Sequence, residues 1–66
     1  MRVIAESEKK DGVRLHFVTL FSESGQDQKL VDALFTVFKV HRSLTIKVSI
    51  IQDVDEEFRS LRIEER

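Results

Sequence analysis

The sequence predicts a small α+β fold in which a single helix covers one face of a short β-sheet. Two stretches of alternating apolar and polar residues flank an Asp-Gly pair, which is the pattern of a β-hairpin. A segment with helical periodicity follows, and a third alternating stretch comes after it. With 66 residues, the chain is expected to form one domain spanning 1–66.

The hairpin is predicted to pair strand Arg2–Glu8 with strand Val13–Phe21, and two registers are open. A two-residue turn places Lys9 opposite Arg14, and like charges in that position are unfavourable. A three-residue turn instead pairs acidic residues of the first strand with Arg14 and His16 of the second. We favour the three-residue turn for this reason. It places Ile4, Val18 and Leu20 on the outer face of the sheet.

The helix is predicted over Gln26–Arg42, where Ser24 and Asp27 provide a capping hydroxyl and an acidic first turn. Its apolar residues cover an arc of roughly 220°, about twice what one sheet face needs. The arc comprises Leu30, Val31, Ala33, Leu34, Phe35, Val37, Phe38 and Val40. We therefore expect the surplus to be buried against a second copy of the chain, most simply in a twofold dimer.

The third strand is predicted over Leu44–Ile51, parallel to the first strand if it lies beside it. The tail, residues 54–66, is open to two interpretations. As a helix it begins with a capping box at Asp53 and Glu56; as a strand it explains the alternation of Leu61 and Ile63. We favour the helix, with a fourth strand (ββαββ) as the alternative. The expected core is Val3, Ala5, Leu15, Phe17, Phe21, Leu30, Leu34, Val37, Phe38, Leu44, Ile46, Val48 and Ile50.

Composition excludes several classes of protein. The chain has no cysteine, so disulfides and thiolate zinc sites are ruled out. Its net charge of -1 provides no long-range field for a nucleic acid. No apolar run approaches the roughly 18 residues of a membrane span, and no secretory pattern opens the chain, so we expect a soluble cytoplasmic protein.

No motif for catalysis, phosphate binding or metal binding occurs, so we expect neither an enzyme, a cofactor nor a small-molecule substrate. The favoured hypothesis is a protein-interaction module, regulatory or inhibitory, that acts as a homo-oligomer. Its expected interface residues are Ile4, Val18, Leu20, Phe35, Val40 and Ile51. The alternative is a nucleic-acid-binding module that uses a basic cluster, Arg14, Lys39, His41, Arg42 and Lys47.

Overall fold

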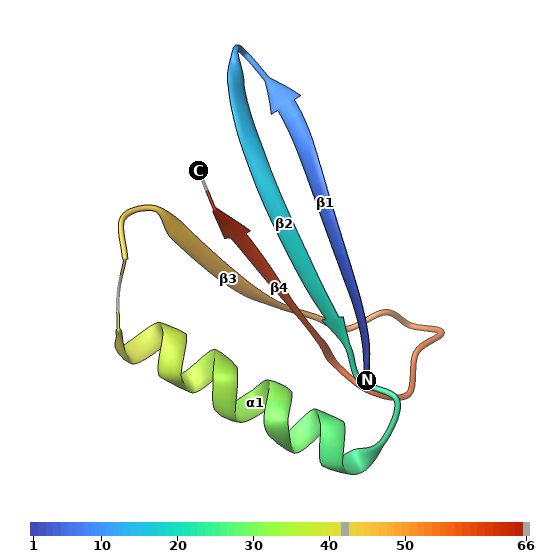
Figure 1. Cartoon of the computed structure of the whole chain (residues 1–66). Coiled ribbons are helices and arrows are strands. Elements are labelled where there is room, and N and C mark those ends of the chain that lie inside the picture. The colour runs from blue at the N-terminus through green and yellow to red at the C-terminus, as the bar shows by residue number, and fades with distance from the viewer. Residues whose placement is uncertain (42, 66) are drawn as a thin grey trace.

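The computed structural model describes residues 1–41 and 43–65 and shows an α+β fold, as the sequence predicts. Its elements are β1 (Arg2–Lys10), β2 (Val13–Phe21), α1 (Gly25–Val40), β3 (Ile46–Ile51) and β4 (Ser60–Glu65). The four strands form one antiparallel sheet in the order β1-β2-β4-β3, and α1 lies on one face of it (Figure 1). The ββαββ alternative is therefore confirmed.

The favoured helical interpretation of the tail is wrong, because β4 fills the centre of the sheet between β2 and β3. Leu61 pairs with both Leu20 and Ile50 and is 0% exposed. Asp53 does accept a hydrogen bond as a helix cap would, because its Oδ1 accepts from the Asp55 N–H (3.3 Å). This bond belongs to a single turn, and no helix follows it in the described part of the tail. Burial of the Leu61 side chain between two strands outweighs the local preference for a helix.

The third strand does not lie beside the first, so the condition for a parallel pair with β1 is not met. β3 pairs with β4, and it runs in the same direction as β2 with β4 between them. The helix α1 thus connects two parallel strands, β2 and β3, and β4 is inserted between them.

The hairpin takes the two-residue turn that we rejected. Lys9 lies opposite Arg14, and Asp11 and Gly12 have φ angles of 53° and 79°. Positive φ at both central residues is the type I′ geometry, which matches the right-handed twist of the strands. The repulsion between the two solvated cations is too weak to displace this turn.

This register changes which side chains share a face. The side of the sheet that faces α1, here called the helix side, carries Val18 and Leu20 of β2 beside Ile63 and Leu61 of β4. The other side, here called the outer side, carries the β2 residues that we expected to face the helix: Leu15, Phe17 and Phe21.

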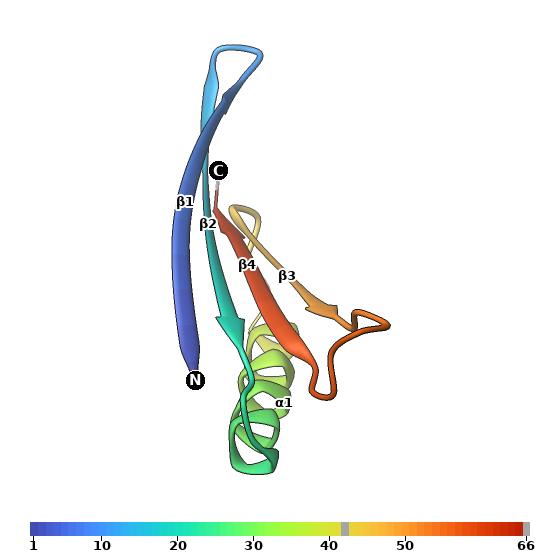
Figure 2. The same cartoon turned by 90° about the vertical axis from the view of Figure 1, so that its right-hand side faces the viewer.

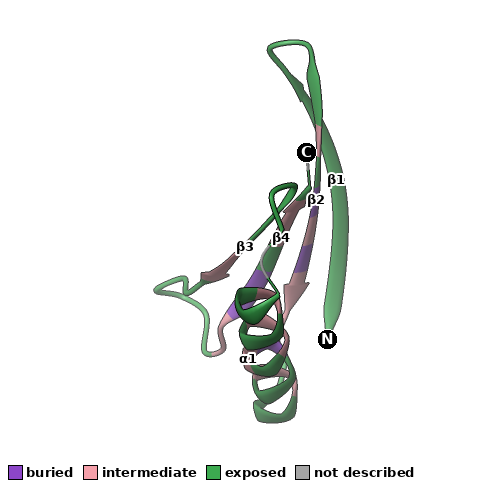
Figure 3. Cartoon of the chain, turned by 90° about the vertical axis from the view of Figure 1, so that its left-hand side faces the viewer, coloured by how far each residue is buried: buried purple, intermediate pink, exposed green. Residues whose placement is uncertain are grey.

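Few side chains are buried (Figure 3). The buried apolar residues among those described are Phe17, Val31 and Leu61. Several expected core residues are exposed instead: Val3, Leu30, Val37, Leu44 and Ile46. The far half of the β1–β2 hairpin projects past the rest of the sheet (Figure 2), because β4 pairs with β2 only from His16 to Leu20.

Candidate functional site

The N-terminal half of α1 is fixed to its surroundings by polar contacts. The Ser24 hydroxyl accepts from the Asp27 N–H (3.2 Å), and the Asp27 carboxylate accepts from the Glu23 N–H (2.9 Å), as the predicted helix start requires. The Glu23 N–H and the Met1 amino group lower the pKa of Asp27. Asp27 and Glu23 in turn raise the pKa of the Met1 amino group, which lies 3.1 Å from Asp27 Oδ2.

A second set of contacts joins α1 to the residue that precedes β4. The Arg59 guanidinium lies 2.6 Å from Asp32 Oδ2, and the Arg59 backbone N–H donates to the side chain of Gln28 (3.2 Å). A helical tail would place Arg59 one turn after Asp55, at the four-residue spacing of a helical ion pair. The strand places Arg59 against α1 instead.

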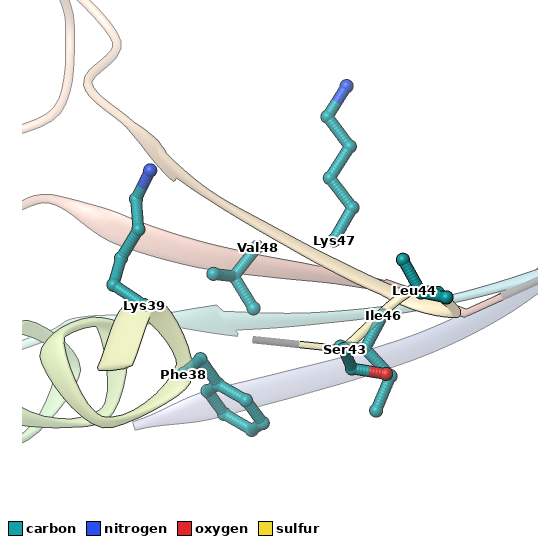
Figure 4. Close-up of a pocket in the computed structure, with 7 residues that line it drawn as sticks. All are labelled: Phe38, Lys39, Ser43, Leu44, Ile46, Lys47 and Val48. Carbon is teal, nitrogen blue, oxygen red and sulfur yellow. The ribbon is translucent and has the colours of Figure 1, made fainter. Parts of the chain in front are cut away.

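The C-terminal half of α1 is less closely packed and borders a cleft of about 540 Å³ between the helix and β3. A smaller cavity of about 220 Å³ adjoins it and includes Val37 and His41. His41 itself caps α1, donating its backbone N–H to the Val37 carbonyl (3.0 Å). The larger cleft is lined by Phe38, Lys39, Ser43, Leu44, Ile46, Lys47 and Val48 (Figure 4).

Part of the predicted basic cluster meets at this cleft. Figure 4 shows the amino groups of Lys39 and Lys47 on the same side of it. Arg14 lies in the projecting hairpin, where its guanidinium donates to Ser7 (3.3 Å). Arg42 lies outside the described residues.

The positive charge at the cleft is partly balanced. Lys47 lies directly opposite Glu64 in the sheet, and the Lys39 amino group lies 5.4 Å from the centre of the Phe35 ring. These contacts reduce the attraction of the two lysines for an external anion.

The cleft has little capacity for acid–base or metal chemistry. The Ser43 hydroxyl accepts from the Thr45 N–H (3.2 Å) and lies 3.1 Å from the Thr45 hydroxyl, so it belongs to a local turn. His16, which we expected opposite an acidic residue of the first strand, lies opposite Ser7. Across residues 1–41 and 43–65, no three His, Cys, Asp or Glu side chains are close enough together to bind a metal ion.

The predicted interface residues do not share one surface. Val18 and Leu20 are half-buried on the helix side, whereas Ile4 and Ile51 are exposed on the outer side. Phe35 is half-buried beneath Lys39, and Val40 is exposed on α1. Whether any of them contacts a partner stays a prediction.

A more continuous apolar surface runs along α1, and two of its four residues, Leu30 and Val37, are ones that we had assigned to the core. Leu30, Ala33, Val37 and Val40 follow one another at spacings of three, four and three, and all are exposed. We call these four residues the α1 stripe. The signal for the stripe was present in the width of the apolar arc, but the sequence did not show which edge of the arc stays uncovered.

The helix side of β1 and β2 is a second uncovered surface. The contacts of α1 with the sheet lie mainly on β3 and β4, and every residue of β1 is exposed. We use the term bare half-sheet for the four apolar residues on this surface, which are Val3, Ala5, Val18 and Leu20.

Comparison with protein-family models, with curated proteins and with solved structures finds no match to this chain. Among the described residues, α1 is neither long nor apolar enough to cross a membrane. Any functional conclusion therefore depends on the surfaces of the chain itself.

Proposed function

We propose that this chain is a non-enzymatic protein-interaction module, regulatory or inhibitory, that acts as a homo-oligomer and most simply as a dimer. The observation that carries the proposal is the amount of surface left exposed. A compact monomer of 7.7 kDa is expected to expose about 4300 Å², whereas this chain exposes 5198 Å².

The size of this excess is informative. It amounts to about 900 Å², close to the roughly 800 Å² that each partner contributes to a protein–protein interface of standard size. Its composition is informative as well, because large apolar side chains are exposed both on β1, at Val3, and along α1, at Leu30 and Val37. Patches of this kind are typical of interaction sites.

A binding role is better supported than a catalytic one. The cleft beside β3 combines apolar side chains with two lysines, and its one hydroxyl from Ser43 is held by Thr45. Neither a nucleophile–base pair nor a pair of carboxylates meets there among the described residues. We expect the chain to act by occupying a surface of another protein.

Nucleic-acid binding is the second proposal, and the grouping of Lys39, His41 and Lys47 near one cleft favours it. The overall charge of -1 and the position of Glu64 opposite Lys47 weaken it. If it is correct, binding weakens steeply as salt is added, since phosphate contacts release counterions.

Sedimentation equilibrium across a range of micromolar concentrations tests the first proposal. We expect a dimer mass, twice 7.7 kDa, that dissociates on dilution. A chain that is fully folded by circular dichroism but monomeric at every concentration would contradict it. Fluorescent single-stranded and duplex oligonucleotides at low salt test the second proposal: salt-sensitive binding that is lost in the Lys39→Ala/Lys47→Ala variant would support it, and the absence of binding would reject it.

A further inference from the structure

We infer that the α1 stripe is the surface through which two copies of this chain meet, with α1 of the partner subunit lying over the bare half-sheet. This inference rests on the proposed homo-oligomer and adds the location and geometry of its interface. It follows from the width of the sheet, the direction that one edge of the stripe faces, and the dipole of α1.

The width of the sheet leaves room for a second helix. Neighbouring strands lie about 4.8 Å apart, so four strands span roughly 19 Å, whereas a helix with its side chains is about 10 Å wide. One helix therefore covers two strands. α1 covers β3 and β4, and the chain has no second helix among its described residues to cover β1 and β2.

One edge of the α1 stripe faces this vacant area. The flank of α1 that carries Gln28 and Asp32 is bonded to Arg59, on the β3–β4 side of the molecule. Asp27 contacts the Met1 amino group at the start of β1 and so marks the opposite flank. At 100° per residue, Leu30 and Val37 project on the Asp27 side, away from Arg59, and so border the bare half-sheet. The other two stripe residues, Ala33 and Val40, lie on the face of α1 turned away from the buried Val31.

The stripe is suited to packing against itself. None of its four residues is charged, so the stripe itself brings no charge into the contact; the nearest charged side chain on α1 is Lys29, one turn before Ala33. With the twofold axis level with Phe35, Ala33 lies opposite Val37 of the partner subunit, and Leu30 lies opposite Val40 of the partner subunit. The small Ala33 side chain permits close approach of the two helices at this crossing.

The dipoles of two adjacent α1 helices favour the antiparallel arrangement, because it places the positive end of each helix beside the negative end of the other. The charged side chains at the ends of α1 do not decide the orientation. Asp27 is paired with the Met1 amino group, and Lys39 lies at the cleft on the β3 side, away from the stripe.

The outer side of the sheet is a weaker candidate for the interface. The Arg62 guanidinium lies 4.3 Å from the centre of the Phe17 ring, and the Arg2 guanidinium lies 4.6 Å from the centre of the Phe21 ring. These cations cover much of the aromatic surface and leave Phe17 only 8% exposed. The aromatic part of the outer side is thus already covered, and the exposed large apolar residues on its strands are Ile4, Val13 and Ile51.

A matched pair of valines tests the location of the interface. Val37 on the stripe is 52% exposed, and Val13 in the hairpin is 51% exposed, so neither is needed to fill the core of the subunit. We expect Val37→Asp to raise the dimer dissociation constant by about 100-fold or more, since the substitution places one charge from each copy in the interface. Val13→Asp should leave the constant within about twofold of the unmodified chain.

A cysteine pair keeps the inference testable if Val37→Asp unfolds the chain. The natural sequence has no cysteine, so every crosslink reports an introduced residue. Mixing the Ala33→Cys and Val37→Cys proteins under mild oxidation should give a covalent heterodimer faster than Val13→Cys forms a homodimer. Heterodimer formation no faster than for Val13→Cys would overturn the stripe as the interface.

The two possible failures are distinguishable. If the unmodified chain is a folded monomer, the proposed homo-oligomer is wrong and the interface fails with it. If the unmodified chain is a dimer that Val13→Asp disrupts and Val37→Asp does not, self-association stands and its location on the α1 stripe is wrong.

Discussion

β1 and β4 both pair with β2, on its two sides, yet their environments differ sharply. β4 has two buried residues, Ser60 and Leu61, whereas all nine residues of β1 are exposed. Part of the difference comes from α1, which covers the helix side of β4 at Leu61 and leaves β1 open. The rest comes from strand order, because β4 has a strand on both sides whereas β1 lies at an edge of the sheet. Ser60 shows the second effect, since it is buried opposite Ile51 on the outer side, where no helix lies. Burial in this fold therefore depends on the helix layer and on the order of the strands together.

The largest expected effect comes from truncating one apolar residue in each strand. Leu61→Ala should lower the free energy of unfolding by about 2–5 kcal/mol, because it leaves a cavity in the covered half of the sheet. Val3→Ala should cost less than about 0.5 kcal/mol in the monomer, since Val3 is 57% exposed. Urea denaturation at a concentration below the dimer dissociation constant measures both values.

The Val3→Ala and Leu61→Ala variants become more informative at protein concentrations above the dimer dissociation constant. If a partner helix covers β1, the cost of Val3→Ala should increase once the dimer forms, whereas the cost of Leu61→Ala should not. Equal costs for Val3→Ala at low and high concentration would show that β1 stays open in the assembly.

An intermediate effect is expected at the contact between α1 and the start of β4. Arg59 and Asp32 form a 2.6 Å ion pair whose side chains are 41% and 45% exposed, so solvent weakens it. A double-mutant cycle with Arg59→Ala and Asp32→Ala should give a coupling of about 0.5–1 kcal/mol. A coupling near zero would mean that burial of Val31 and Leu61 alone holds the helix on this half of the sheet.

The smallest effect is expected at the start of α1 and depends on pH. The pKa of Asp27 is held below its ordinary value of 3.8, chiefly by the Glu23 N–H. A group with a lowered pKa in the folded state stabilises that state at neutral pH, and loses this effect as the pH falls through the folded-state pKa. Asp27→Asn should therefore lower the melting temperature at pH 7 and have little effect well below pH 3.8. If the melting temperature of Asp27→Asn is lowered by the same amount in acid, then Asp27 contributes through capping geometry and not through its charge.

The sequence predicted the local elements better than their assembly. The hairpin, the helix with its Ser24 cap and the strand near Ile46–Ile51 are all present, because each depends on neighbouring residues. The hairpin register was missed because we weighted the Lys9–Arg14 repulsion above the twist preference of the Asp-Gly turn.

The tail was missed for a different reason. Its strand conformation depends on a vacancy between β2 and β3, which is a long-range property that no local pattern of residues contains. The candidate surfaces show the same division. The excess of apolar surface on the helix was visible in its periodicity. Its position depended on which half of the sheet α1 covers, and that was not visible.

Isotope-filtered nuclear Overhauser spectroscopy on a mixture of labelled and unlabelled chains tests the central claim most directly, because it detects only contacts between copies. The account predicts intermolecular signals between the methyl groups of Ala33 and Val37, and between those of Leu30 and Val40. Intermolecular signals confined to Ile4, Val13 and Ile51 would place the interface on the outer side of the sheet and contradict it.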